Sequence, residues 1–412
     1  MTKDRLFYGW VVVTAGIIIS AIIFGTRYSF GVFFKSIETD FNLSRGTTSG
    51  IFSIYMLLCC IFAILGGWAL DKYGPKIIGI LMGIFAGLSL LLTSQTTSLW
   101  QLFVTYSLLL AIGTGATYTT VMSTTSRWFQ KKRGLALGIV GTGGGLGTTI
   151  MAPFTTYLIS NLEWRMSFIV LGLICLFSMI TLSLLLKKDP REIGALPDGI
   201  KVEAGNINTE VRQNNTQLTS FSLLQAIKTR NFWLLGIIWL LYSLCLHLIL
   251  THFVPHTTDI GFSAMQAAVL LSLTSGICIP SRLLMGWASD RMSRKTTTII
   301  SSLLVAAAML SLVWSQDLWA LYLFAVLFGF GWGGIDPPIV ALIGDVFGMR
   351  NIGIIMGALG IGWAIGAAVG PLIGGVIFDF SDSYSMAFMA GAIAMLILSI
   401  SAALIRQDSK TE

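Results

Sequence analysis

The sequence predicts an all-α membrane protein with twelve transmembrane helices in two six-helix pseudo-repeats, and three observations predict this class. Charged residues make up 11% of the 412 residues and apolar residues 55%, whereas a soluble domain carries roughly 25% charged residues. Apolar runs of about 18 residues or more, the length that spans a bilayer, recur along the whole chain. Short motifs also return at one fixed spacing. These features fit a lipid-facing surface and exclude a water-facing one.

The apolar runs divide the chain into twelve expected spans. Their bounds are 9–34, 48–70, 76–95, 100–125, 133–159, 165–187, 232–256, 265–289, 296–315, 318–344, 351–378 and 384–406. The first run is too long for a cleavable signal peptide, so we expect it to be the first span. The end of the polar stretch after the sixth span, 221–230, fits a short amphipathic helix. We therefore expect an N-terminal half at 1–187, a cytoplasmic linker loop at 188–231 and a C-terminal half at 232–412.

The basic residues predict how the chain is oriented in the membrane. With the N-terminus in the cytoplasm, 21 of the 26 Lys and Arg residues lie in cytoplasmic segments. Three lie at outer ends (Lys35, Arg45 and Arg165), and Arg27 and Arg282 lie within spans. This distribution follows the positive-inside rule. We expect a multi-pass protein of the bacterial inner membrane with both termini cytoplasmic, and no nucleic-acid partner is needed to explain the net charge of +7.

Three pairs of motifs indicate an internal repeat. Gly67-Trp-Ala-Leu-Asp-Lys follows the second span and Gly286-Trp-Ala-Ser-Asp-Arg follows the eighth, with their Asp residues 219 apart. Asp40-Phe-Asn-Leu-Ser and Asp259-Ile-Gly-Phe-Ser are also 219 apart, and a proline after a glycine-rich run recurs at a spacing of 218. Such a pattern predicts two parallel repeats related by an axis normal to the membrane.

The two Gly-x-x-x-Asp-[Lys/Arg] loops resemble the signature loop of the major facilitator superfamily, at both places where that family carries it. The resemblance covers the whole chain and implies the major facilitator fold. It also implies a gating role, in which acidic and basic groups at helix ends latch one conformation. The residues concerned are Asp71, Lys72, Asp290 and Arg291, together with Arg133 in the basic loop after the fourth span. Helix capping and topology signalling are the alternative role.

A narrower resemblance lies around the fourth and fifth spans. Tyr118 and the segment 127–147, which begins Arg-Trp-Phe-Gln-Lys-Lys-Arg-Gly-Leu-Ala-Leu-Gly, are similar to the signature of the monocarboxylate transporter family, and the oxalate:formate antiporter family carries a similar sequence. The entry of the first span, Asp-Arg-Leu-Phe-Tyr-Gly-Trp, and the glycine-rich eleventh span also fit. The resemblance implies a carrier of small organic anions such as lactate or pyruvate, often moved with a proton.

Two arginines lie inside predicted spans, where a charge costs at least roughly 2.5 kcal/mol. A guanidinium matches a carboxylate through two parallel hydrogen bonds. The resembling families keep a substrate-binding arginine at the position of Arg282, so we expect Arg282 to bind substrate, with a structural role as the alternative. Their acidic or amide partner one turn earlier is replaced by Cys278. Arg27 is a second expected anion ligand or entry guide, unless it extends toward the outer interface.

Titratable and hydroxyl groups inside the spans are further candidates. His252 is expected to bind the anion and to carry a proton, because histidine titrates in the physiological range. Asp336, before two prolines in the tenth span, is a second proton-coupling candidate, or a structural acid paired with an arginine. Tyr118 matches a substrate-binding position of the family. His247 and His256 are expected to be packed and interfacial, respectively.

Several classes of protein are excluded or disfavoured. The five cysteines lack metal or disulfide spacing, and the glycine runs lack a nucleotide-binding ending. We therefore expect no metal, no cofactor, no enzymatic site and a monomer embedded in lipid. The favoured hypothesis is a proton-coupled, lactate- or pyruvate-like monocarboxylate carrier working by alternating access. The alternatives are an oxalate:formate-like antiporter, a drug efflux carrier, which two buried arginines disfavour, and a non-transporting sensor.

Overall fold

The computed structural model describes residues 7–129, 133–193, 198, 221–348 and 351–406, and all of its regular elements are helices. In chain order they are α1 (Tyr8–Tyr28), α2 (Phe30–Asp40), α3 (Arg45–Thr93), α4 (Leu99–Leu102), η1 (Phe103–Leu109), α5 (Leu110–Thr114), α6 (Thr117–Trp128), α7 (Arg133–Gly141), α8 (Gly143–Leu184), η2 (Pro190–Ile193), α9 (Leu223–Ile227), α10 (Arg230–Asp259), α11 (Ala264–Arg291), α12 (Arg294–Trp314), α13 (Leu318–Phe347), α14 (Ile352–Ser381) and α15 (Ser385–Leu404).

Ten helical segments of the described chain are long and apolar enough to cross a membrane. Two of them each contain two crossings. α3 has 49 residues and is interrupted at Gly74, whose φ of 81° ends one helix before Pro75 begins the next. α8 is interrupted in the same way at Glu163, with a φ of 64°. The twelve predicted crossings are therefore confirmed, because each interruption falls between two predicted spans.

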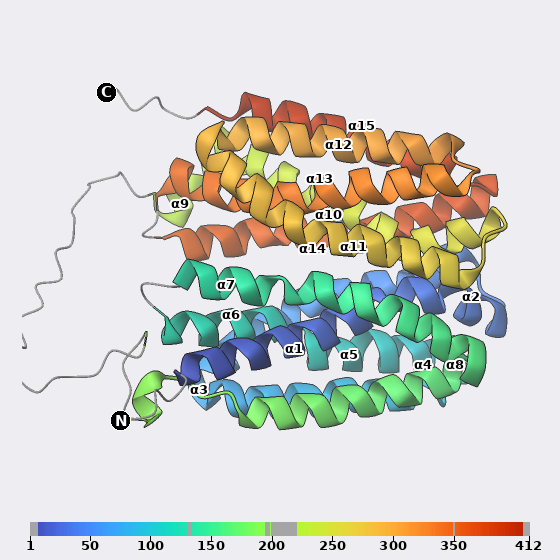
Figure 1. Ribbon diagram of the computed structural model, residues 1–412, viewed down its shortest axis with the longest axis horizontal. Helices are drawn as coiled ribbons and strands as arrows, with labels where there is room; N and C mark the ends of the chain where they lie inside the picture. Colours follow the sequence, from blue (N-terminus) through green and yellow to red (C-terminus); the bar gives the residue numbers. More distant parts are fainter. Residues whose placement is uncertain (1–6, 130–132, 194–197, 199–220, 349–350, 407–412) are drawn as a thin grey trace, which may run out of the picture.

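The helices form two bundles that lie one above the other in Figure 1. The first bundle holds α1 to α8 and the second holds α10 to α15. α1 begins and α15 ends on the left of that view, which we call the termini side, and the opposite end is the far side. The bundles meet where α3 packs against α14, α8 against α11, and α2 against α10. This arrangement confirms the predicted pair of six-helix repeats.

Buried apolar residues form two clusters, each drawn almost entirely from one bundle. Large apolar side chains such as Ile64, Trp68 and Trp314 are instead exposed, as is typical of helices that contact lipid. Within the first bundle α8 approaches α1 so closely at Gly147 that a Cβ there would overlap the backbone of Ala21. Glycine at this position is therefore a packing requirement.

The ends of several helices carry local sequence signals. The predicted amphipathic helix at 221–230 corresponds to α9, which Ser222 and Gln225 begin with a reciprocal capping box. The same device, made by Ser263 and Gln266, begins α11. In the first crossing the helix is interrupted at Ser29, whose hydroxyl donates to the carbonyl of Gly25 at 2.8 Å. The two capping boxes satisfy backbone groups that a helix end leaves unpaired.

Candidate functional site

An ion pair between α11 and α13 lies where the second bundle faces the first. Nη2 of Arg282 donates to a carboxylate oxygen of Asp336 at 2.8 Å, and Nη1 donates to the carbonyl of Gly141, at the end of α7, at 3.2 Å. Arg282 therefore touches both bundles. Its side chain is 29% exposed and that of Asp336 is 35% exposed. Because Arg282 reaches across to α7, these exposed surfaces face the space between the bundles rather than lipid.

The backbone around this pair is held by close contacts and is loosened by proline. At Gly333 a Cβ would overlap the carbonyl of Cys278, so glycine lets α13 approach α11. The hydroxyl of Ser281 donates to the carbonyl of Phe330 across the same contact. Pro280 and Pro337 lie inside their helices and each removes one backbone hydrogen bond. The two helices are thus fixed beside each other at a place where regular helix hydrogen bonding is interrupted.

Tyr118 on α6 and Tyr242 on α10 border the Arg282–Asp336 pair from opposite bundles. The side chain of Tyr118 is 61% exposed, and it lies within electrostatic reach of both charges. Tyr242 is buried beside the same two charges, and its hydroxyl donates to the carbonyl of Trp332 at 3.2 Å. Among the described residues, Nε of Arg282 and Nε1 of Trp332 are enclosed and have no hydrogen-bond partner.

Arg27 lies in the first bundle, held by neutral groups. Its Nε donates to the hydroxyl of Tyr55 at 2.9 Å, and its Nη2 donates to Sγ of Cys59 at 3.7 Å and to the carbonyl of Thr114 at 3.4 Å. The guanidinium also lies over the ring of Phe24 at 5.0 Å. None of the ion pairs found in the described part of the chain includes Arg27. Its charge is therefore not neutralised by a carboxylate.

His247 lies where rings from the two bundles meet. Its ring is 6.0 Å from that of Tyr28 in the first bundle and 5.6 Å from that of Trp363 in the second. Nδ1 is 2.8 Å from the carbonyl of Ser243, which can only accept, so Nδ1 carries a proton. Nε2 is then an acceptor, and it is buried without a partner among the described residues. Sequence reasoning treated His247 as a packed residue and did not select it for the site.

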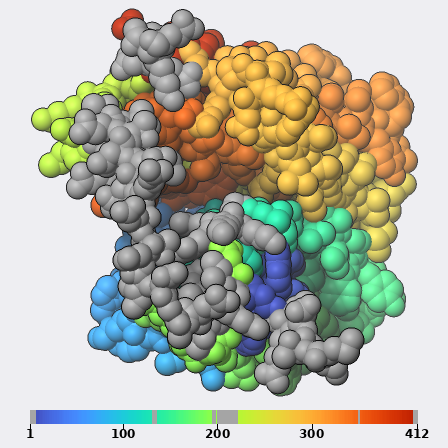
Figure 2. All heavy atoms as spheres, turned by 60° about the vertical axis from the view of Figure 1, so that its left-hand side comes forward, coloured from blue at the N-terminus to red at the C-terminus, as the bar shows by residue number. Residues whose placement is uncertain are grey.

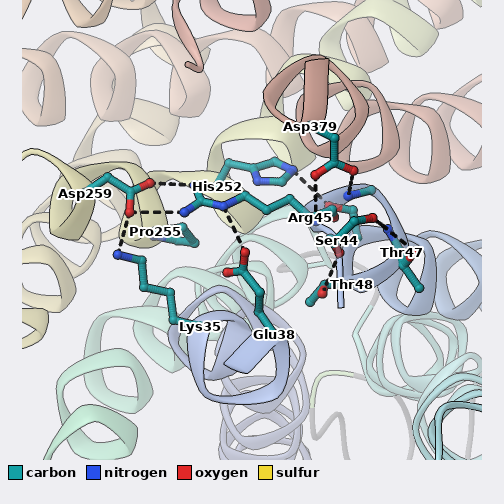
Figure 3. Close-up of polar contacts among 12 residues, drawn as sticks. Lys35, Glu38, Ser44, Arg45, Thr47, Thr48, His252, Pro255, Asp259 and Asp379 are labelled. Carbon is teal, nitrogen blue, oxygen red and sulfur yellow. Dashed lines mark hydrogen bonds and ion pairs between the residues drawn. The ribbon is translucent and has the colours of Figure 1, made fainter. Parts of the chain in front are cut away.

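On the far side, charged residues join the two bundles in what we call the far-side cluster (Lys35, Glu38, Arg45, Asp259 and Asp379), drawn in Figure 3. Nη1 and Nη2 of Arg45 donate to the two carboxylate oxygens of Asp259 at 2.5 and 3.1 Å. Nε of Arg45 donates to Glu38 at 3.2 Å, and Nζ of Lys35 is 2.5 Å from Asp259. Asp379 accepts the backbone N–H of Arg45 at 2.8 Å.

His252 lies next to this cluster (Figure 3), and its hydrogen bonds are made there rather than to Arg282. Nε2 is 2.7 Å from the carbonyl of Pro371 and 3.2 Å from the hydroxyl of Ser49 in the other bundle. Since a carbonyl only accepts, Nε2 carries the proton and Nδ1 accepts from the hydroxyl of Tyr384 at 3.0 Å. Burial raises the pKa of Tyr384, so its phenol keeps the proton that it donates. The structure thus places His252, which was predicted to bind the anion, on the far side.

On the termini side, ion pairs stay within one bundle. Asp71 pairs with Arg127 at 2.8 Å in the first bundle, and Asp345 pairs with Arg294 at 2.7 Å in the second. The other predicted gating residues form no ion pair among the described residues: Lys72 lies over the ring of Trp68, Arg291 lies over that of Trp287, and Asp290 has no charged partner. The side chain of Arg133 lies outside what the structure describes.

The molecule is consequently closed on the far side and open on the termini side. Figure 2, in which the termini side is turned forward, shows the boundary between the blue-to-green first bundle and the yellow-to-red second bundle where grey atoms do not cover it. No ion pair among the described residues crosses between the bundles there, whereas the far-side cluster crosses at several points. The Arg282–Asp336 pair is therefore reached from the termini side in this conformation.

Comparisons with known proteins agree with this architecture. The family model described as the Major Facilitator Superfamily matches residues 16–314 and 277–412. Monocarboxylate transporter 13 of Rattus norvegicus is 27% identical, over 94% of this chain and 87% of that protein. Monocarboxylate transporter 12 of Homo sapiens is 24% identical, over 98% of this chain and 82% of that protein.

Among solved structures, a bacterial homolog of the human lysosomal transporter Spinster, in an inward-facing and unoccupied conformation, has the same fold. The two superpose with a TM-score of 0.73 at 16% identity, covering 98% of this chain and 96% of the other. With the family match and the two bundles together, the protein is a multi-pass membrane protein that belongs to the Major Facilitator Superfamily and is similar to monocarboxylate transporters.

Proposed function

We propose that this protein is a secondary active transporter that moves small monocarboxylates, of the lactate or pyruvate kind, together with protons by alternating access. The observation that carries the proposal is the Arg282–Asp336 pair, which lies between the bundles and is about one third exposed. An arginine so placed matches the carboxylate of an anion. The similarity to monocarboxylate transporters supports the same substrate class.

The pair also supplies a physical reason for proton coupling. Asp336 occupies one edge of the Arg282 guanidinium, with a single hydrogen bond at 2.8 Å. A substrate carboxylate competes with Asp336 for this guanidinium. Protonation of Asp336 removes its negative charge and releases Arg282. Anion and proton therefore favour each other's binding, which is the linkage that a symporter needs. The resembling families carry an acidic or amide residue on this helix one turn before the arginine, where this chain has Cys278. Asp336 on α13 thus takes over the role of that residue.

Other predicted residues have subsidiary roles in this proposal. Tyr118 donates a hydrogen bond to the bound carboxylate from the first bundle, opposite Arg282. Binding that joins the two bundles favours their closure around the substrate. Asp71, Lys72, Asp290, Arg291 and Arg133 control the termini side, as the family resemblance implies. His252 acts by linking the bundles at the far side, beside Ser49.

The same proposal includes location and organisation. The termini side is the cytoplasmic side of a bacterial inner membrane, because the orientation predicted from the sequence assigns 21 of the 26 basic residues to cytoplasmic segments. The chain acts as a monomer with an N-terminal half at 1–187, a linker at 188–231 and a C-terminal half at 232–412. It transports rather than catalyses, and it needs no cofactor or metal.

Exchange of a dicarboxylate for a monocarboxylate is a second candidate, and Arg27 favours it. Nη1 of Arg27 has no hydrogen-bond partner among the described residues and is not among the enclosed unpartnered atoms. A second guanidinium with a free edge suits a second carboxylate. Counterflow of dicarboxylates that does not depend on pH would favour this candidate over the first.

The proposal is tested with purified protein in proteoliposomes. We expect saturable uptake of labelled lactate or pyruvate, driven by an imposed pH gradient and abolished by Arg282→Ala. Absence of uptake and of counterflow for every short carboxylate, or full activity of Arg282→Ala, would contradict it. Retained binding of these acids without any movement would instead revive the sensor hypothesis.

A further inference from the structure

The two repeats use one acidic position in different ways. In the first bundle Asp40 pairs with Arg165 at 2.6 Å, and both residues belong to that bundle. Nη1 of Arg165 also donates to the carbonyls of Ser94 and Thr96, at 3.1 and 2.7 Å. Asp259 is the counterpart of Asp40 in the 219-residue repeat. It pairs instead with Arg45 and Lys35, which both belong to the other bundle.

The sequence of the repeat explains this difference. The segment Trp164-Arg-Met-Ser-Phe168 corresponds to Tyr384-Ser-Met-Ala-Phe388, with the Met and Phe residues each 220 apart. The structure agrees, because Trp164 contacts Phe168 as Tyr384 contacts Phe388, with ring centroids 5.8 Å apart in both. Ser385 therefore stands where the first repeat has Arg165. In its own bundle Asp259 has no arginine at the matching position.

Arg45 is the residue that takes the vacant place. Its side chain is only 9% exposed, and its guanidinium bonds both oxygens of Asp259 and also the hydroxyl of Tyr384 at 2.8 Å. The ring of Phe378 lies 3.6 Å from the guanidinium carbon. Asp259, Tyr384 and Phe378 all come from the second bundle. A single side chain of the first bundle is thus enclosed by the second.

Asp379 adds a backbone contact to the same junction. Its two carboxylate oxygens accept the N–H groups of Arg45 and Gly46, each at 2.8 Å. These amides begin α3, where a helix leaves its N–H groups unpaired and a negative charge is favoured. A carboxylate of one bundle thus caps a helix of the other. Opening the far side must break this cap and the Arg45–Asp259 pair together.

We propose that loss of the repeat's arginine at Ser385 is what converts Asp259 into an interbundle anchor, and that Arg45 latches the carrier closed on its far side through it. The inference rests on the alternating access of the proposed function but not on any substrate. An arginine restored at position 385 competes with Arg45 for Asp259, as Arg165 holds Asp40. The far-side-open population then rises by about 10- to 100-fold, the range that loss of charge-assisted hydrogen bonds produces.

The experiment is hydrogen–deuterium exchange of the full-length protein in nanodiscs, comparing wild type with Ser385→Arg and Ser385→Gln. Gln supplies a long polar side chain without charge and is the matched control. We expect Ser385→Arg to speed exchange in far-side peptides covering 44–50 and 371–384, and to slow it in the termini-side peptide covering 117–128. Ser385→Gln should match wild type in all three peptides.

The opposite changes at the two ends distinguish a shift in conformation from damage to the fold. Local unfolding would speed exchange at the far side and leave the termini side unchanged or faster, which would overturn the proposal. Equal behaviour of the Arg and Gln variants would also overturn it. Arg45→Gln is a second test, because it removes the latch from the other bundle and should reproduce the Ser385→Arg pattern. Failure of carboxylate transport would not alter these readouts.

Discussion

Replacing Asp336 by Asn should tighten the binding of a carboxylate and remove its pH dependence. In the structure Asp336 holds one edge of Arg282 through a single hydrogen bond at 2.8 Å. Asn keeps the size of the side chain but cannot ionise, so the substrate no longer competes with a negative charge. The proton and the anion then lose their linkage.

The size of this effect follows from the geometry. The Arg282–Asp336 contact uses Nη2 alone, and the two side chains are 29% and 35% exposed. A charge-assisted hydrogen bond that is partly screened by water contributes about 1.5 kcal/mol, at the low end of its usual range. Carboxylate affinity should therefore rise about tenfold in Asp336→Asn at neutral pH. At acidic pH, where Asp336 of the wild type is already protonated, the wild type and Asp336→Asn should bind the carboxylate with equal affinity.

The assay is equilibrium binding of labelled lactate or pyruvate to detergent-solubilised protein across a pH series. Asp345→Asn is the matched control. Asp345 lies on α13 like Asp336, but its ion pair with Arg294 on α12 is away from the site. That variant should bind as wild type does at each pH. Weaker binding by Asp336→Asn, or an unchanged pH dependence, would refute the competition on which the proton coupling rests.

Two further predictions concern a single side chain each. The side chain of Tyr118 is 61% exposed, and Tyr118→Phe removes the hydroxyl that it offers to the substrate. The apparent KM for the substrate should rise about fivefold, the value of one neutral hydrogen bond, while Tm stays that of wild type. An unchanged KM would remove Tyr118 from the site. Gly147→Val places a side chain against the backbone of Ala21 and should lower Tm by several degrees. At Gly138 an added Cβ has no described atom within 4 Å, so Gly138→Val should not lower Tm. Equal melting of the two variants would contradict the packing described.

The twelve crossings and the two repeats are predictable from the sequence because hydropathy is a local property. Each apolar run by itself indicates a helix that crosses the membrane, and the fixed spacing of the repeated motifs indicates two related halves. Arg282 and Asp336 are conspicuous for the same reason, since a charge inside an apolar run is costly and needs a partner. That they are each other's partner requires the packing of α11 against α13, which no local pattern reveals.

The far-side cluster lies beyond such reasoning. Arg45 and Asp379 are at helix ends, where charged residues are ordinary, and they are 334 residues apart in the chain. Only the meeting of the two bundles makes them neighbours. A signal was nevertheless present in the repeat, because a comparison of Trp164–Phe168 with Tyr384–Phe388 shows an arginine in one copy and a serine in the other. His252, by contrast, was singled out from the sequence because histidine suits proton coupling, but its position in α10 places it on the far side, away from Arg282.

The measurement that tests the central claim most directly is uptake of labelled lactate or pyruvate into proteoliposomes, with and without an imposed pH gradient, by wild type and by Arg282→Ala. Arg282 is the guanidinium that faces the space between the bundles and reaches both of them. We predict saturable uptake that the gradient accelerates in wild type, and uptake at the level of empty liposomes in the variant. Uptake by Arg282→Ala equal to that of wild type would contradict the account.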